Sequence, residues 1–281
     1  MSQPTKLQRC VLLDGAKVRP LYRYLYSQES QPQWMALYSQ TELEPLSDIS
    51  PVLVSVQPDS PLLYEVEQTL GPEGKAIKLE SFEALEVVGE HLRNMLFASR
   101  GSGERILFRF YEARAFEVLQ DLPVTRQTHQ FFGPVQSFSW VSPQYLFWRD
   151  WQRPDTADPL PEPNRPLPVF PLPDEWGEAL KKAQQVPTAA QILRFLKEHP
   201  AYLGNRDTPS LLAYARKALE HSSPLKPKHW EEVQEYFDLC LLHGPDFLSR
   251  QVIPGTAGIL ADPALSCSEK LQRLNDRSLF I

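Results

Sequence analysis

Hydrophobic and polar residues alternate over residues 105–111, RILFRFY, and we take this stretch as the element around which the chain is organised. A period of two over β-favouring residues is typical of a strand. Both faces carry apolar side chains, so the pattern predicts a strand inside a sheet. From residue 112 the spacing becomes helical, and Pro123 ends it. One strand should therefore run into one helix, with a polar cluster at the joint formed by Arg109, Glu112 and Arg114.

The same alternation of patterns predicts the fold of the first half. Strand-like runs lie at residues 10–13, 34–38, 52–56, 75–79, 131–140 and 145–148. Helical spacing occurs at residues 20–25, 60–70 and 83–98. Strands that alternate with helices of about ten residues indicate an α/β layer. We therefore expect an α/β lobe with a mixed, partly parallel sheet over residues 1–152.

Proline marks the end of this lobe. The chain has 27 prolines, against about 5% in ordinary proteins, and residues 153–173 are especially rich in them. Proline removes backbone donors and fixes φ, so this segment should be an extended, semi-rigid linker. A ligand for an SH3-type module is the alternative. Residues 174–281 then show only helical patterns, which predicts an all-α lobe of about five helices.

Composition excludes several classes of protein. The net charge is −6 without a basic tract, which argues against a nucleic-acid partner. Three widely spaced cysteines argue against a disulfide scaffold or structural zinc. No window approaches the roughly 20 apolar residues of a membrane span, and the N-terminus lacks a signal-peptide pattern. We expect a cytoplasmic, soluble protein without a membrane partner and without a cofactor.

No catalytic signature emerges from the motifs. Asp14 follows an apolar run and could accept a phosphoryl group, but Asp14-Gly15 is also a common turn dipeptide. Glu112 beside two arginines could act as an acid or base, but an ion-paired joint is the better interpretation. The histidines form no metal-binding pair. We expect a protein that is not an enzyme, with a hydrolase using Asp14 or Glu112 as the less favoured alternative.

Aromatic residues cluster near the end of the first lobe. Large aromatics dominate interface hot spots, although most simply fill a core. As a hypothesis, the protein-binding residues are Phe131, Phe138, Trp140, Tyr145 and Trp148, together with Trp230 and Tyr236 of the helical part.

Several short motifs, taken in order, resemble a bacterial family. They are LLDGA at 12–16, SPVLV at 50–54, Ser81 with HLR at 91–93, FRFY at 108–111 followed by Arg114, and FFGP at 131–134. This arrangement is similar to the type VI secretion effector adaptors, also called effector chaperones. The corresponding motif cluster consists of Asp14, Gly15, Arg109, Tyr111, Glu112, Arg114, Phe132, Gly133 and Pro134. One departure is Glu112-Ala113-Arg114 where the family has Asp-Pro-Arg, a conservative change at a structural joint.

The resemblance implies a non-enzymatic role. Such an adaptor binds a toxic effector before export and loads it onto the VgrG spike, in some cases with a co-adaptor. Of the two lobes, the helical one is our choice for effector recognition. An immunity protein that binds and neutralises a toxin is the main alternative.

Overall fold

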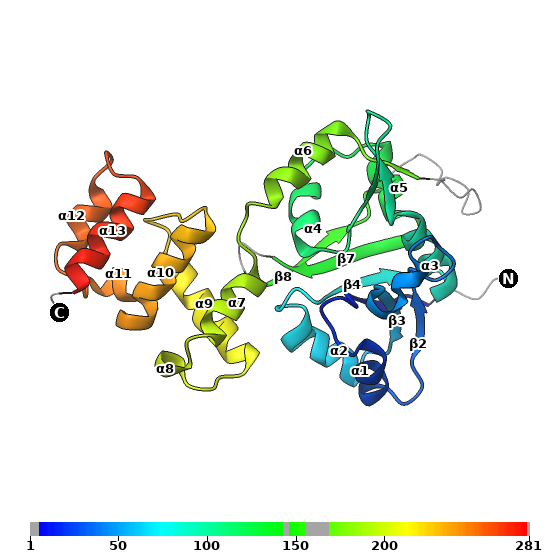
Figure 1. Cartoon of the computed structure of the whole chain (residues 1–281), viewed down its shortest axis with the longest axis horizontal. Helices are drawn as coiled ribbons and strands as arrows, with labels where there is room; N and C mark the ends of the chain where they lie inside the picture. The colour runs from blue at the N-terminus through cyan, green and yellow to red at the C-terminus, as the bar shows by residue number, and fades with distance from the viewer. Residues whose placement is uncertain (1–5, 143–145, 156–168, 280–281) are drawn as a thin grey trace. The chain divides into compact units, whose positions relative to one another are not determined.

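The computed structural model describes residues 6–142, 146–155 and 169–279. The chain divides into two compact units, which are considered separately (Figure 1). The first comprises residues 1–142 and 147–184, and the second comprises residues 143–146 and 185–281. The α/β fold class of the first half and the helical class of the second are confirmed.

A six-stranded antiparallel sheet forms the centre of the first unit. Its middle strands are continuous runs of apolar residues, as expected of strands covered on both faces. In spatial order the strands are β2 (Gln33–Ala36), β3 (Val52–Val56), β1 (Gln8–Leu13), β4 (Ala76–Ser81), β7 (Val135–Val141) and β8 (Trp148–Gln152).

A second sheet of three short strands contains the parallel pairing. β5 (Phe97–Ser99) pairs antiparallel with β6 (Arg105–Leu107) and parallel with β9 (Phe170–Pro171). The expected mixed, partly parallel sheet is thus present, but its parallel part is confined to this small sheet.

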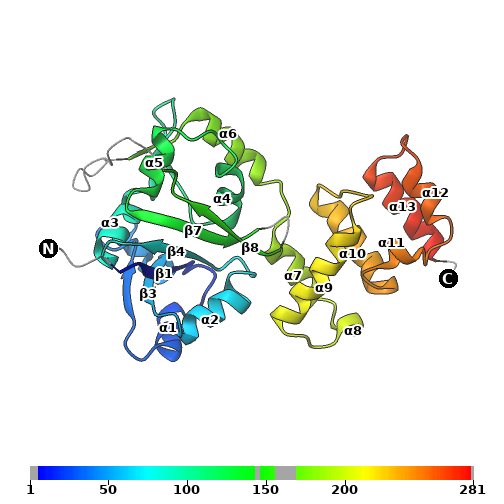
Figure 2. The ribbon, with the colours of Figure 1, turned by 180° about the vertical axis from the view of Figure 1, so that it is seen from behind.

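Helices cover both faces of the central sheet (Figures 1 and 2). On one face, Leu12, Leu53 and Leu79 share a core with α3 (Leu85–Asn94), α4 (Ala113–Leu119), α5 (Arg126–Phe132) and α6 (Asp174–Ala183). On the other, Val11 and Val54 pack with α1 (Leu21–Gln28), α2 (Pro61–Glu65) and the π-helix η2 (Val66–Leu70). A 3₁₀ helix, η1 (Glu44–Ile49), leads into β3.

The second unit is helical. The capping box expected at Thr188 is present, because the Thr188 side chain accepts from Gln191 N and Gln191 Oε1 accepts from Thr188 N. Arg216 Nε donates to the carbonyl of Leu146, at 2.7 Å, within this unit. Its helices are α7 (Ala189–Lys197), α8 (Pro200–Leu203), α9 (Thr208–His221), α10 (Trp230–His243), α11 (Phe247–Arg250), α12 (Thr256–Ala261) and α13 (Cys267–Ser278).

The stretch 105–111 is not the interior strand that its alternation predicts. Only residues 105–107 are a strand, and β6 lies at the edge of the small sheet. The chain then leaves the ladder, because Phe108 and Phe110 are drawn into the aromatic core, where they are 4% and 0% exposed. Helix α4 follows close to the expected position.

Two further elements differ from expectation. Residues 131 and 132 end helix α5, which begins with a capping box between Thr125 and Thr128, and strand β7 starts only at Val135. The helix expected over 83–98 ends at Asn94, and residues 97–99 form β5. In both cases aromatic or apolar runs concealed a turn.

The boundary between the units differs from the expected linker at 153–173. Helix α6 belongs to the first unit, because Trp176 is buried in the same core as Phe131 and Phe170, and the division comes after Gln184. Residues 170 and 171 form β9, whereas residues 156–168 of the proline-rich segment lie outside the described residues.

Candidate functional site

The residues that suggested chemistry in the sequence meet at one place in the first unit. Asp14 leaves the end of β1, while Arg109 lies 95 positions later, just before α4. Arg109 Nη2 donates to Asp14 Oδ2 at 2.9 Å, and Lys17 Nζ lies 3.3 Å from the same oxygen. The carboxylate of Asp14 is only 5% exposed. A buried carboxylate is stable when it is paired and hydrogen-bonded, and Asp14 is both.

Glu112 continues this network toward α4. Its Oε1 accepts from Arg109 Nε at 2.7 Å, and its Oε2 lies 3.3 Å from Arg114 Nε. Arg109 therefore joins two carboxylates through a planar guanidinium, which suits such bridging. The expected ion-paired joint is confirmed, and it also ties β1 to the start of α4.

Tyr111 packs beside this network. Its ring lies 5.2 Å from the Arg109 guanidinium carbon, and the residue is 6% exposed. Burial and a hydrogen bond with Tyr38 raise the pKa of Tyr111 far above its usual value, so the phenol stays protonated at neutral pH. Burial lowers the pKa of Arg109, but Tyr111, Asp14 and Glu112 outweigh that effect and raise it overall.

Asp14 also makes the turn that its dipeptide predicts. Its Oδ1 accepts from Ala16 N at 3.1 Å, which is an Asx turn. Gly15 lies against the end of η1, where a Cβ atom would be 2.1 Å from the carbonyl oxygen of Ser50. The motif residues 14–16 and 50–54 are thus neighbours in space, and glycine is needed for that close approach.

A second contact joins the remaining motif residues. Gly133 has φ +49° and lies under the ring of His91, whose Nε2 donates to the carbonyl of Phe131 at 3.0 Å. Burial lowers the pKa of His91, despite the opposing effect of that hydrogen bond, so the ring is neutral at pH 7. Ser81 Oγ donates to the carbonyl of Pro134 at 2.8 Å, and Phe132 is fully buried. These contacts join α3 to α5 and β4 to the start of β7.

The aromatic residues offered as a protein-binding surface are mostly in the core. Phe131, Phe138, Trp140 and Tyr236 are each 0% exposed, so their rings are not available to a partner. In the first unit, Phe131 packs against several rings, including those of Phe116 and Trp151. The binding hypothesis for these four residues is wrong. For Phe138 and Trp140 on β7, alternation along the strand could not reveal that helices cover their side of the sheet. Phe131 and Tyr236 lie on helices and face the cores of their units.

The other three aromatic residues are placed differently. Trp148 is half-buried, and its Nε1 donates to the carbonyl of Glu67 at 3.2 Å. Trp230 is also half-buried and meets the ring of Phe195 edge-on. Tyr145 lies outside the described residues.

Sequence reasoning missed Glu117 on α4. Its carboxylate, only 11% exposed, accepts from Trp140 Nε1, Ser142 Oγ and Arg149 Nη1 at 2.9, 3.0 and 2.9 Å. A single glutamate thus fixes both strands of the β7–β8 hairpin to α4. Its place on the polar side of an amphipathic helix resembled that of any solvated glutamate, so only the fold reveals its role.

The described residues contain few features of a catalytic centre. Burial raises the pKa of Cys10 and Cys240 to about 12, and burial with Glu232 and Glu235 raises that of Cys267 to about 11, so these thiols are protonated at neutral pH. No group of three or more metal-ligating side chains occurs in the part of the chain that the structure describes. No helix over the same residues is long and apolar enough to cross a membrane.

Comparison with known families adds to this geometry. A family model described as "Domain of unknown function (DUF4123)" matches residues 11–130. Residues 11–130, which are less than half of the 281-residue chain, are therefore similar to a DUF4123 domain. This family is associated with type VI secretion effector adaptors, which agrees with the resemblance seen in the sequence. Searches of curated proteins and of solved structures found no match.

The DUF4123 segment accounts for much of the site. It contains Asp14, Gly15, Arg109, Tyr111, Glu112 and Arg114, and it includes His91, the ring that covers Gly133. Asp14, Tyr111 and His91 contact distant parts of the first unit, and Gly15 packs closely on Ser50. Glu112 and Arg114 pair within the joint itself. The motif cluster therefore acts as the set of ties that holds the DUF4123 fold together.

The pairing of Asp14 with Arg109 can be measured by a double-mutant cycle. Arg109→Met should destabilise the first unit by about 2 kcal/mol, because it leaves a buried carboxylate with Lys17 as its remaining cation. Combined with Asp14→Asn, the cost should be at least about 1 kcal/mol below the sum of the single changes. Chemical denaturation would measure this.

Arg100→Met provides the control for this cycle. Arg100 pairs with Glu104 in the open, with both side chains more than half exposed, so its loss should cost less than about 0.5 kcal/mol. Additive effects at Asp14 and Arg109 would show that their contact contributes nothing to the fold.

Proposed function

We propose that the chain is a non-catalytic adaptor that binds a type VI effector toxin and loads it onto the VgrG spike. The observation that carries this proposal is the DUF4123 domain, whose family is associated with effector adaptors. A protein of this kind needs surfaces for partners rather than a reaction centre.

The chemistry of the site supports a role without catalysis. Asp14 and Glu112, the two candidates for a hydrolase, are held by Arg109, Lys17 and Arg114. A nucleophile or general base requires a group poised to react, whereas these carboxylates are occupied in structural pairs. The buried thiols of Cys10 and Cys240 are protonated at neutral pH.

The division into two units supports a bridging role, because each unit has its own core and its own surface. We assign effector choice to the helical unit, which lies outside the DUF4123 segment. Exchange of residues 185–281 between two adaptors tests this assignment. Effector choice should follow the helical unit, and choice that stays with residues 1–184 would overturn the assignment.

Export of the effector tests the adaptor role itself. In a strain that lacks this chain, effector delivery to prey cells should fall to background, and the wild-type chain should restore it. Asp14→Asn and Glu112→Gln chains that fold should restore it too. Loss of export in a variant that still folds and binds the effector would favour an enzyme, and protection from the toxin without VgrG would favour an immunity protein.

A further inference from the structure

The central sheet of the first unit has two edges, and they differ in chemistry. Over the described residues, β2 pairs only with β3, and β8 pairs only with β7. Sheet edges are usually protected by charged side chains, because free backbone groups can pair with another chain. β8 carries Arg149 and Asp150, whereas β2 reads Gln-Trp-Met-Ala and carries no charge. β2, which is labelled in Figure 1, is therefore the less protected edge.

The hydrogen-bond pattern shows which backbone groups of β2 face outward. Leu37 N donates to the carbonyl of Pro51 at 2.9 Å, which continues the antiparallel register of β2 with β3. Hydrogen-bonded pairs alternate along such a ladder, so Met35 and Gln33 also face β3. The N–H groups of Trp34 and Ala36 and the carbonyl of Trp34 then point away from the sheet. Pro32, which lacks an N–H, limits the free edge to the residues after it.

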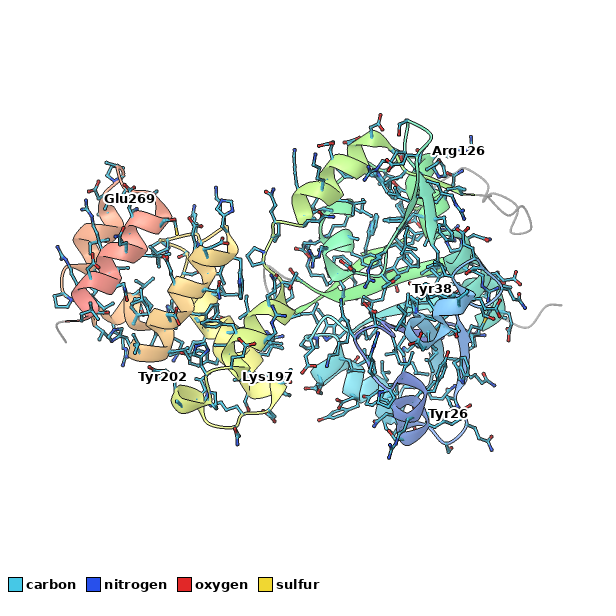
Figure 3. The ribbon with its side chains drawn as sticks, in the orientation of Figure 1. Tyr26, Tyr38, Arg126, Lys197, Tyr202 and Glu269 are labelled. Carbon is cyan, nitrogen blue, oxygen red and sulfur yellow. The ribbon has the colours of Figure 1, made fainter. Side chains whose placement is uncertain are left out.

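An aromatic surface lies beside this edge on the side of helix α1. The rings of Trp34 and Tyr22 are 5.0 Å apart, and Trp34 Nε1 is 3.5 Å from the hydroxyl of Tyr26. Tyr26 is 57% exposed, and Figure 3 shows it on the outer side of α1. Met35, which alternates with Trp34, instead lies against Gly89 of α3. Any strand added to β2 would place every second side chain on the Tyr22–Trp34–Tyr26 surface.

The charge beside this surface is positive. Arg19 lies just before α1 and Arg23 lies on its first turn; both are exposed, and neither has an ion-pair partner among the described residues. Together with Tyr22 they line an open depression of about 560 Å³, in which Asp48 is the one acidic lining residue. Two arginines against one aspartate favour a carboxylate in the bound segment.

We propose that β2 is a docking strand, where an extended, acidic segment of a partner protein adds to the central sheet. The backbone of the segment pairs with Trp34 and Ala36, apolar side chains lie on Tyr22, Trp34 and Tyr26, and an acidic side chain meets Arg19 and Arg23. In this binding mode, backbone hydrogen bonds supply affinity and side-chain contacts supply specificity. The proposal rests on the adaptor function, since it names a binding surface for one of the adaptor's partners.

Ala36→Pro tests this docking strand in the full-length chain. Proline is tolerated on edge strands where its missing N–H would face solvent, so the variant should fold while losing one docking donor. The chain has two candidate partners here, the effector and the VgrG encoded beside it. The affinity of the variant for one of them should fall by about tenfold or more. Amide exchange at Trp34 and Ala36 should slow when that partner binds to the wild-type chain. Arg23→Glu should weaken the binding of the same partner.

Asp150→Pro is the matched control at the opposite edge of the sheet. Arg153 N donates to the carbonyl of Gln136, so the same alternation places the N–H of Asp150 outward from β8. This variant should bind both partners as the wild type does. If the folded Ala36→Pro chain binds both partners with the same affinities as the wild-type chain, the docking strand is overturned and the adaptor role remains intact.

Two further outcomes separate the alternatives. If the wild-type chain binds neither partner, the adaptor function fails and the docking strand fails with it. If light scattering shows a wild-type dimer that Ala36→Pro converts to a monomer, the occupant of β2 is a second copy of this chain, which also overturns the proposal.

Discussion

Gly133→Ala should destabilise the first unit by about 3 kcal/mol or more, the sum of two costs. The first is backbone strain, because Gly133 has φ +49° and ψ −119°, a conformation that other residues rarely adopt. The second is a collision, because the new Cβ atom would lie 2.3 Å from Cε1 of His91. Thermal and chemical unfolding of the purified variant would measure the loss.

Two comparisons separate strain from collision. Gly103 has φ +81° and no atom within 4 Å of its would-be Cβ, so Gly103→Ala reports strain alone and should cost less. Adding His91→Ala to Gly133→Ala removes the ring that collides, so the double variant should lose less stability than the two single changes added together. If the two changes prove additive, the packing of His91 on Gly133 is not what requires glycine at this position.

Gly15→Ala should have a cost of similar size, about 3 kcal/mol, for a different reason. Here the collision is with backbone, since the new Cβ atom would lie 2.1 Å from the Ser50 oxygen and 2.9 Å from the carbonyl carbon of Ile49. Backbone cannot rotate aside as a side chain can, so either the turn after β1 or the end of η1 must move. That shift would also displace Asp14 from Arg109, and denaturation of the variant measures the combined effect.

Gly177→Ala is the control for this substitution. Gly177 lies within helix α6, and no atom is within 4 Å of its would-be Cβ. Alanine is a better helix former than glycine, so this change should stabilise the unit by about 0.5–1 kcal/mol. A Gly15→Ala chain as stable as the wild type would mean that the turn does not pack on η1 as described.

Much of the fold follows from patterns that are local in the sequence. The β-branched run at 52–56 is a buried strand, Ser60 caps α2, and the Thr188 box opens α7, each within a few residues of its expected place. Such features depend on neighbours along the chain, so the sequence displays them directly. The ion pairs at the joint before α4 also followed from spacing, since Arg109, Glu112 and Arg114 lie within one or two turns.

What could not be predicted depends on contacts between distant segments. Phe110 belongs to a core rather than to a strand, because its ring packs against Phe131 of α5 and against Phe108. Its alternation with neighbouring residues suggested the opposite. The pairing of Asp14 with Arg109 spans 95 positions, and Glu117 meets Arg149 across 32. No periodicity in the sequence indicates these long-range partners. The motif residues could therefore be recognised as a set, but the sequence did not show which of them contact one another.

These contacts give the motif cluster a physical meaning. Gly15 and Gly133 permit close approach, His91 and Ser81 bind the backbone around Gly133, and Arg109 joins two carboxylates. Residues with these tasks preserve a scaffold, and in our proposal the edge strand β2 and the helical unit are the surfaces that recognise partners. This separation suits a family of adaptors whose effectors differ.

The most direct test of the adaptor role is to mix the purified chain with the effector and the VgrG encoded beside it, and to measure the molar masses of the complexes by light scattering. An adaptor should give a complex that contains all three proteins, and no complex of effector with VgrG should form when the chain is left out. An effector that binds VgrG equally well without this chain, or a chain that holds the effector and excludes VgrG, would contradict the adaptor role.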